Sequence, residues 1–228
     1  MNSRHLKILA IIIMTVDHVG AILLPDVIGW RLGGRLAFPL FAFLIAYGCT
    51  KTRNIEKFFI RLLIFGIISQ IVIQIVTLDF FSQIRLMNIF FTLAAGVACI
   101  LVWNRIRGNT IDAIILRVSL ICVILVAGLF LRFDYGIGGI MMIFLFYLAL
   151  RNSVQMCKVT AILILLVFNT AVSITTWSVG IQWLSMLSLP FILLFIDQKL
   201  KIPKWERWLF YIYYPTHLAI LFVIMHFI

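Results

Sequence analysis

The chain alternates between long apolar runs and short polar connections over its whole length. About 20 consecutive apolar residues span a bilayer as an α-helix, because a helix satisfies its backbone hydrogen bonds internally. The pattern predicts nine helices, at 6–24, 32–50, 58–78, 88–103, 110–131, 136–150, 159–177, 180–197 and 207–227. The runs at 88–103 and 136–150 are short and 159–197 is nearly continuous, so eight helices are the alternative.

Composition narrows the class of protein. Hydrophobic residues make up 64% of the 228 residues and charged residues only 12%, with a mean hydropathy of +1.16. A soluble domain of this size could not cover its surface with so few polar groups. The sequence therefore predicts an all-α, polytopic integral membrane helix bundle in which residues 1–228 form a single transmembrane domain.

The formal net charge of +11 by itself would suggest a nucleic-acid partner, but the distribution of Lys and Arg argues otherwise. With nine helices and a cytoplasmic N-terminus, the outer side holds only four of the 19 cations, Arg31, Arg35, Arg85 and Arg132. Inner loops of membrane proteins carry such an excess. We expect a multi-pass cell-membrane protein, surrounded by lipids, with its C-terminus outside and no nucleic-acid partner.

Two further features bear on class. The four cysteines are scattered without paired spacing, so we expect neither disulfides nor a metal site. The first 24 residues resemble a signal peptide in charge and hydrophobicity, but Asp17 and His18 interrupt the apolar core and no small-residue cleavage site follows. We expect this segment to be retained.

Asp17 and His18 place two adjacent ionisable side chains inside the first apolar run. Such residues usually face a bundle interior, a cavity or a partner, since a charge at mid-bilayer costs about 2.5–3.5 kcal/mol on insertion scales. Lys7 lies eleven residues before His18, which puts both on one helix face about 16 Å apart along the axis. This arrangement suits a donor with phosphates at one end and a reactive thioester at the other, such as an acyl-coenzyme A. Interfacial anchoring is the alternative for Lys7.

The last helix contributes a second intramembrane histidine. His217 follows Tyr213 by four residues, and Pro215 interrupts the backbone ladder between them. Counted from Arg207, His217 lies about 15 Å from the inner surface, close to the predicted depth of His18. The two imidazoles could therefore line one cavity, although a buried histidine can also be an ordinary packing residue.

Other polar residues gather toward the outer half of the bundle. Arg35 is predicted to pair with Asp17, because an arginine one turn into lipid needs a partner, and Arg31 lies one turn before it. Asn88 opens the fourth helix and Asp134 precedes the sixth, and both are candidate substrate-binding residues, with helix capping as the alternative. On the inner side, the basic segments 51–61 and 199–207, the latter including Arg207, could bind coenzyme A phosphates or only set topology.

A histidine that titrates near neutral pH and sits in a partly dry cavity can act as a general base toward an amine or hydroxyl. No nucleophile elbow, metal cluster or phosphate-binding glycine loop suggests another reaction. Two alternatives stay open. A small transporter or flippase could use the same charges, although no inverted repeat is visible. A non-enzymatic assembly partner would leave both buried histidines unexplained.

Several segments, in this order and spacing, resemble the TraX family of bacterial membrane proteins. They are Leu6-Lys7-Ile8, Asp17-His18-Val19-Gly20, the stretch 34–43, Arg61-Leu62-Leu63, Phe91-Thr92-Leu93, Asp134-Tyr135-Gly136, the stretch 183–190 and the stretch 210–218. The resemblance covers nearly the whole chain. More distantly, it extends to membrane acyltransferases that acetylate glycans, which carry a basic residue, usually Arg, eleven residues before the first-helix histidine. Lys7 stands there in this chain, and it lacks the bidentate fork of Arg.

The resemblance implies acetyl transfer from acetyl-coenzyme A to a pilin-like peptide or surface glycan in a bacterial cytoplasmic membrane. On this hypothesis His18 is the general base and Asp17 and Arg35 support it. His217 forms the second wall of the site with Tyr213 or Tyr214. Donor-binding candidates are Lys7, Tyr213, Tyr214 and Arg207, and acceptor-binding candidates are Asn88, Asp134 and Arg31. Direct transfer and a relay through an acetyl-histidine are both open.

Overall fold

The computed structural model describes residues 1–24, 26–76, 87–176, 181–198 and 203–227. Within these ranges the chain forms nine α-helices and one 3₁₀-helix. They are α1 (Ser3–Leu23), α2 (Ile28–Lys51), α3 (Ile55–Val76), α4 (Ile89–Arg105), α5 (Ile111–Phe130), α6 (Gly136–Asn152), α7 (Val154–Thr176), η1 (Ile181–Ser188), α8 (Leu189–Leu193) and α9 (Lys204–Phe227).

Local sequence signals explain several helix ends. Asn2, Asn88 and Thr110 cap α1, α4 and α5, each accepting a hydrogen bond from a backbone N–H of the first turn. Lys51, Arg105 and Arg151 occupy the last turns of α2, α4 and α6, where a cation complements the helix dipole.

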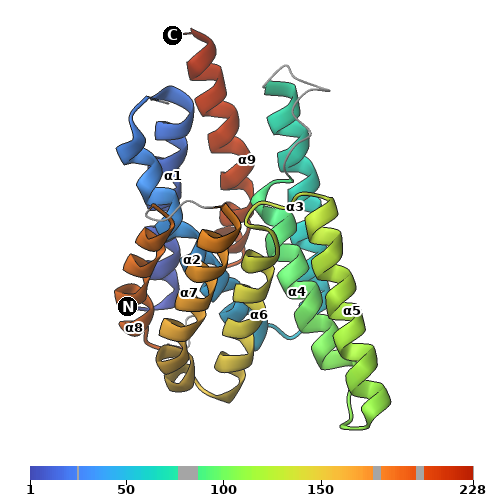
Figure 1. The fold of residues 1–228 in the computed structure, drawn as a ribbon. Coiled ribbons are helices and arrows are strands. Elements are labelled where there is room, and N and C mark those ends of the chain that lie inside the picture. Colours follow the sequence, from blue (N-terminus) through green and yellow to red (C-terminus); the bar gives the residue numbers. More distant parts are fainter. Residues whose placement is uncertain (25, 77–86, 177–180, 199–202, 228) are drawn as a thin grey trace.

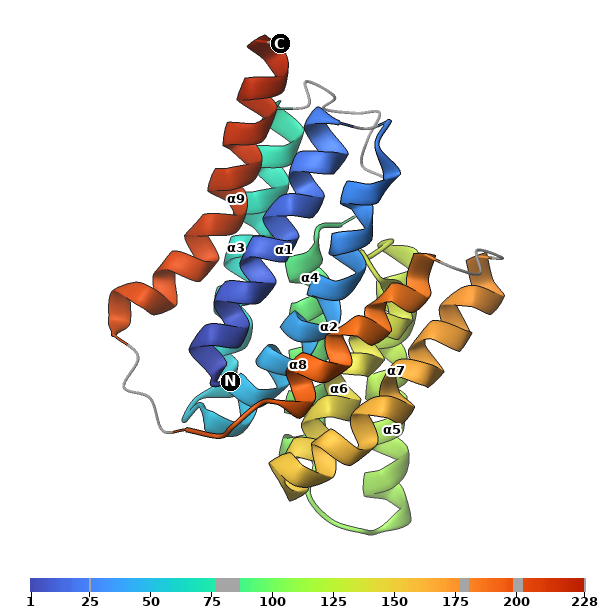
Figure 2. The ribbon, with the colours of Figure 1, turned by 90° about the vertical axis from the view of Figure 1, so that its left-hand side faces the viewer.

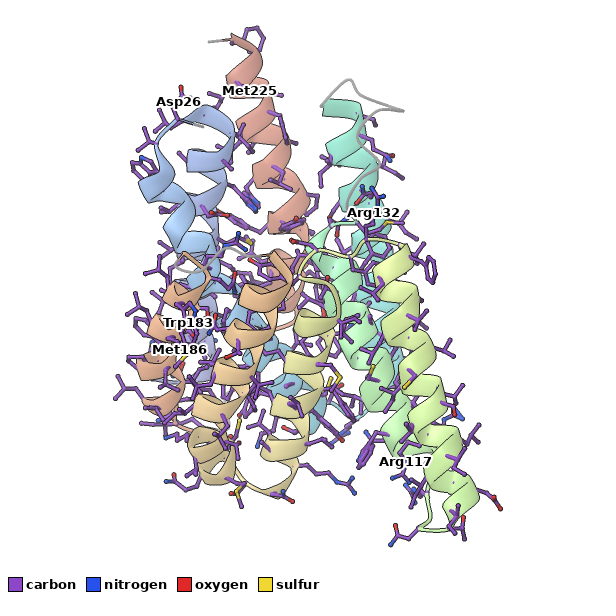
Figure 3. The ribbon with its side chains drawn as sticks, viewed as in Figure 1. Asp26, Arg117, Arg132, Trp183, Met186 and Met225 are labelled. Carbon is purple, nitrogen blue, oxygen red and sulfur yellow. The ribbon has the colours of Figure 1, made fainter. Side chains whose placement is uncertain are left out.

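The predicted membrane helix bundle is confirmed. Five helices of the described chain, α1, α2, α3, α5 and α9, are long and apolar enough to cross a membrane. α4, α6, α7 and the η1–α8 segment contain shorter apolar helices. α5 exposes a nearly continuous apolar surface, with Ile111 75% and Phe130 84% exposed, as expected of a helix that faces lipid. Figure 3 shows exposed Trp183 on the outside of η1.

The predicted span 180–197 differs from the structure in geometry. Residues 181–188 form a 3₁₀-helix and only 189–193 continue as an α-helix. Ser188, at the junction, turns its hydroxyl back to the carbonyl of Ser185, and Pro190 follows within the first turn of α8. Pro is accepted in the first turn of an α-helix because its missing N–H has no partner there. The new helix therefore starts at this point.

Successive helices run in opposite directions, so the connections at 51–55, 106–110 and 152–154 lie at the same end of the bundle (Figure 1). We call this the basic end, because it carries Arg4, Lys7, Lys51, Arg53, Lys57, Arg61, Arg105, Arg107, Arg117, Arg151 and Lys158. Figure 3 shows Arg117 near this end and Asp26 and Met225 near the opposite one. In both ribbon views α1 and α9 run side by side (Figures 1 and 2).

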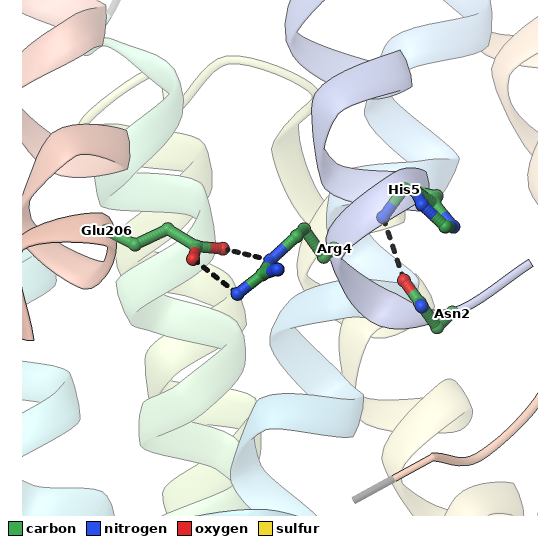
Figure 4. Close-up of polar contacts among 4 residues, drawn as sticks. All are labelled: Asn2, Arg4, His5 and Glu206. Atoms are coloured by element: carbon green, nitrogen blue, oxygen red, sulfur yellow. Dashed lines mark hydrogen bonds and ion pairs between the residues drawn. The ribbon is translucent and has the colours of Figure 1, made fainter. Parts of the chain in front are cut away.

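An ion pair fastens the first and last helices together at the basic end (Figure 4). Arg4 donates from Nε and Nη2 to the two carboxylate oxygens of Glu206, at 2.9 and 2.8 Å. Glu206 is buried, so a bidentate partner satisfies a carboxylate that would be costly alone. The contact fixes the start of α9 against α1 and sets which faces of the two helices meet farther along.

Candidate active site

A hydrogen-bonded histidine pair joins α1 to α9. Nδ1 of His18 lies 2.7 Å from Nε2 of His217, and the two rings stack with centroids 5.0 Å apart. His217 is buried and His18 is partly exposed. The two residues are 199 positions apart in sequence. The two histidines, predicted to lie at similar depth, are in direct contact, but only His18 lines the central cavity described below.

With both imidazoles neutral, two hydrogen bonds assign the positions of their protons. Nδ1 of His217 lies 2.8 Å from the backbone carbonyl of Tyr213, and a carbonyl oxygen only accepts, so Nδ1 carries the proton. In a neutral imidazole Nε2 of His217 then accepts, and Nδ1 of His18 donates to it. The remaining nitrogen of His18, Nε2, is the basic one. Such a partner orients a catalytic base by holding one tautomer.

Tyr213 supports His217 from behind. Its ring stacks on the His217 ring with centroids 4.8 Å apart. The Thr15 hydroxyl donates to the carbonyl of Ile11, so the Tyr213 hydroxyl donates to Thr15 across 2.7 Å. Tyr213, a predicted donor-binding residue, is therefore engaged with α1 and is not among the side chains that line the central cavity described below.

Tyr214 faces the other way, toward the cavity. It is buried, and its ring lies edge-on to both His18 and His217, with centroids 5.9 and 5.6 Å away. Tyr214 lines the central cavity described below together with His18.

The Asp17 carboxylate packs against the backbone of α2 at Gly34. A Cβ on Gly34 would stand 2.4 Å from Cγ of Asp17, so only glycine allows this approach. The predicted ion pair between Asp17 and Arg35 is not among the contacts of these two described residues, and Arg35 does not line the cavity. The physical reason is that the carboxylate meets α2 at the residue before Arg35. A role for Arg35 stays a prediction.

The connection between α5 and α6 brings Asp134 and Tyr135 to the same region. Tyr135 has φ 60°, in the left-handed region that a bulky side chain rarely adopts. Its ring stacks on Phe38 with centroids 3.8 Å apart, and its hydroxyl donates to the carbonyl of Gly34. Thr92 donates to the backbone carbonyl of Asp134. These contacts hold the strained turn against α2 and α4.

A central cavity of about 550 Å³ connects these groups with the basic end. Its deep end is lined by Asp17, His18, Asp134, Tyr135 and Tyr214. Its walls are apolar, with side chains such as Phe41, Leu44, Ile45, Leu62 and Leu93. Its mouth is lined by Lys7, Lys51, Thr52 and Arg61. The size lies within the range of small-molecule sites in proteins.

A second cavity of about 640 Å³ adjoins the mouth and shares Lys51, Thr52 and Arg61 with it. We call this second cavity the vestibule. Arg53, Asn54, Lys57, Ile60 and Trp208 complete its lining. The vestibule and the central cavity thus form one path, which starts at a strongly basic surface, continues between apolar walls and ends at His18.

The other predicted residues fall into three groups. Lys7 lines the central cavity with His18, as the helix geometry predicted, and its ammonium lies 4.2 Å from the centroid of the Phe210 ring. Asn88 caps α4, and its amide group donates to the carbonyl of Gly66 and to Gln70 of α3. These contacts of Asn88 join the start of α4 to α3. The side chains of Arg31 and Arg207 lie outside the described part of the chain.

Sequence reasoning did not single out Thr15 and Tyr135 as site residues, and it placed Arg61 only within the basic segment 51–61. Gly34 carried one signal, because it stands in a Gly-Gly pair where helices can approach closely. Thr15 lies one turn before His18 and shares its face, a signal that was available. Tyr135 lies in a connection whose backbone conformation no local pattern specifies.

By fold and site, the chain is an all-α membrane protein with a hydrogen-bonded histidine pair, of which His18 lines the end of a cavity. The family model described as TraX protein matches residues 2–225, so the chain belongs to the TraX family.

Two relatives align with nearly the whole chain. It is 28% identical to the "Probable fimbrial assembly protein FimC, serogroup H1" of Dichelobacter nodosus, over 96% of this chain and 94% of that protein. It is 28% identical to "Protein TraX" of Escherichia coli (strain K12), over 96% of this chain and 85% of that protein. No solved structure matches the chain.

Proposed function

We propose that the protein is a membrane-embedded acetyltransferase that moves an acetyl group from acetyl-coenzyme A to an amine or hydroxyl acceptor. One observation carries the proposal: a histidine with a defined basic nitrogen lines the deep end of a cavity whose mouth is cationic. An acyl-coenzyme A has its phosphates at one end and its thioester at the other, and the cavity offers matching chemistry in the same order.

The proposed topology follows from charge. The basic end faces the cytoplasm, where coenzyme A thioesters are made, and the opposite end faces outward in the bacterial cell membrane. The cations at the basic end support this orientation, since inner loops carry the Lys and Arg excess. The acceptor reaches the deep end from the outer side or laterally.

In the proposed reaction Nε2 of His18 takes a proton from the acceptor as its nitrogen or oxygen attacks the thioester carbonyl carbon. The carbonyl oxygen becomes negatively charged, and the Tyr214 hydroxyl donates a hydrogen bond to it. The carbon–sulfur bond then breaks, and the imidazolium of His18 returns its proton to the departing thiolate. The acetylated acceptor and free coenzyme A result, and His18 is neutral again.

His217 contributes through His18. By accepting from Nδ1 of His18, it keeps Nε2 as the basic nitrogen and stabilises the imidazolium that forms during transfer. Tyr213 and Thr15 keep His217 in place. The chain of contacts from Thr15 to His18 is therefore a positioning device built between α1 and α9.

The relatives supply the biological setting of the proposal. One is named a probable fimbrial assembly protein, and the family resemblance is to proteins associated with pilin acetylation. From these two similarities we infer a role connected with pili, without a particular acceptor. The acceptor we propose is a pilin-like peptide, and a surface glycan is the second candidate.

The decisive experiment follows thiol release from acetyl-coenzyme A by the purified protein in lipid nanodiscs, with a peptide bearing a free amino terminus as acceptor. We expect acceptor-dependent thiol release, which His18→Ala lowers by about 10²–10⁴-fold. His5→Ala is the matched control, because His5 is an exposed histidine of the same helix and does not line the cavity.

Two results would contradict the proposal. One is thiol release that His18→Ala leaves unchanged. The other is the absence of thiol release with peptide and glycan acceptors alike, together with His18-dependent uptake of a solute into vesicles, which would favour the transporter.

A further inference from the structure

The vestibule holds three cations that no carboxylate in the described part of the chain neutralises. Lys51 pairs with Asp197 at 2.7 Å. Arg53, Lys57 and Arg61, by contrast, form no ion pair with any carboxylate in the described part of the chain. Nearby Glu56 pairs with Arg105, and Glu206 pairs with Arg4. Glu56, Asp197 and Glu206 are thus committed to cations outside the vestibule or at its edge.

Arg61 is the most informative of these residues. It lies one and a half turns into α3 and lines both the vestibule and the central cavity. Its Nε is buried and has no hydrogen-bond partner among the described residues. The guanidinium instead lies between two rings, 5.8 Å from the centroids of Phe58 and of Tyr211. Aromatic neighbours hold the position of an arginine without using its donors, which stay available for an anion.

An aromatic side chain completes the vestibule. Trp208 lines it and is 47% exposed, although its neighbours Phe65 and Tyr211 lie with centroids 6.0 and 6.3 Å away. An exposed indole beside unneutralised cations is the combination that binds a nucleotide, since a base stacks on the ring while phosphates meet Arg and Lys.

We propose that the vestibule binds the phosphorylated adenosine end of the coenzyme A donor, with Arg61, Lys57 and Arg53 on its phosphates and Trp208 against its base. This inference rests on the proposed function and adds to it the site that recognises the donor. Arg61, at the junction of the two cavities, meets the phosphates nearest the pantetheine arm. The arm continues between the apolar walls toward His18.

The test separates donor recognition from chemistry by using two donors. S-acetylpantetheine carries the thioester but no nucleotide, whereas acetyl-coenzyme A carries both. For Arg61→Gln we expect kcat/KM with acetyl-coenzyme A to fall about tenfold or more, because a charge-assisted hydrogen bond is lost. With S-acetylpantetheine the same variant should equal the parent protein. Equal losses with both donors would overturn the proposal.

A binding measurement keeps the inference independent of turnover. Calorimetric titration of coenzyme A and of adenosine 3′,5′-bisphosphate into nanodiscs of phosphatidylcholine should show binding that weakens in Arg61→Gln and Lys57→Gln. Trp208→Leu should weaken adenosine bisphosphate binding while leaving inorganic pyrophosphate binding unchanged. Arg151→Gln is the matched control, because Arg151 is exposed at the basic end outside both cavities.

Each outcome assigns the site or rejects it. Arg61-dependent nucleotide binding without acetyl transfer would support the vestibule and reject the proposed function. Acetyl transfer that is insensitive to Arg61, Lys57 and Trp208 would reject the vestibule and leave the proposed function standing. If these variants weaken binding of phosphatidylglycerol vesicles but not of coenzyme A, the vestibule is a lipid headgroup site and the proposal is wrong.

Discussion

The two ends of the central cavity satisfy their polar groups in opposite ways. Beside the deep end, the carbonyl of Tyr213, His217 and His18 form one chain of hydrogen bonds in which neutral imidazoles give each proton an assigned position. At the mouth, Arg61 lies beside the rings of Phe58 and Tyr211, and the ammonium of Lys7 lies over Phe210, and neither cation has an ion pair among the described carboxylates. The polar contacts of the histidine pair lie within the protein, whereas Arg61 and Lys7 have no carboxylate partner in the described part of the chain.

This difference matches what each end is proposed to do. A catalytic base works best when its tautomer and orientation are set before the reaction, because no reorganisation then accompanies proton transfer. A binding surface works best when its cations keep their donors for the ligand, because a protein carboxylate would compete with the phosphate. Substitutions at the deep end should therefore lower kcat, and those at the mouth should raise KM for the donor.

His217→Ala should have the largest effect among the positioning residues. It removes the acceptor for Nδ1 of His18, so the histidine loses its fixed tautomer, and we expect kcat to fall about 10²-fold. KM for acetyl-coenzyme A should stay near the parent value. Steady-state thiol release measures both constants. A His217→Ala enzyme with unchanged kcat would show that the pair is only a packing contact.

Tyr214→Phe should lower kcat less, by about tenfold, since one hydrogen bond to the developing oxyanion is lost while the ring and its packing remain. Tyr213→Phe is the comparison, because it removes a hydroxyl that bonds to Thr15 and not to the cavity. Equal effects of the two substitutions would argue against a direct role of the Tyr214 hydroxyl.

Lys7→Ala should act on the donor and not on the chemistry. We expect KM for acetyl-coenzyme A to rise about fivefold, corresponding to roughly 1 kcal/mol of lost attraction, with little change in kcat. Lys7→Arg should restore the parent KM, because the charge returns. A fall in kcat with unchanged KM would place Lys7 with the deep end instead.

Asn88→Ala should affect turnover least and stability most among these changes. Loss of its hydrogen bonds to Gly66 and Gln70 removes a clamp between α3 and α4, which we expect to cost about 1–3 kcal/mol of unfolding free energy. Thermal unfolding in detergent tests the structural role of Asn88, and the KM for the acceptor tests its substrate-binding role. A raised acceptor KM with unchanged stability would support the substrate-binding role that the sequence suggested.

Much of the fold could be predicted because membrane spans follow from local composition. The predicted boundaries of α2 to α6 lie within a few residues of those observed, and α1, α7 and α9 each begin a few residues earlier than predicted. The η1–α8 segment was predicted as one span, but its 3₁₀ geometry was not. An apolar run predicts that a segment crosses the membrane, whereas the choice of helix type depends on packing and on hydrogen bonds such as that of Ser188.

Among the site residues, His18, His217 and Lys7 could be found from the sequence because intramembrane ionisable groups are rare and helical spacing relates them. The position of Asp17 against Gly34 could not, since it depends on how closely two helices approach. The same holds for Tyr135, whose left-handed backbone is held by contacts with Phe38 and Gly34.

The amino-acid sequence alone was sufficient for the membrane helix bundle, its basic end and the two intramembrane histidines, because each depends on residues close together along the chain. The tertiary structure was needed for the hydrogen bond between His18 and His217, the tautomer that follows from it, and the unneutralised cations of the vestibule. These features depend on which faces of α1, α3 and α9 meet, and that arrangement results from the packing of the whole bundle.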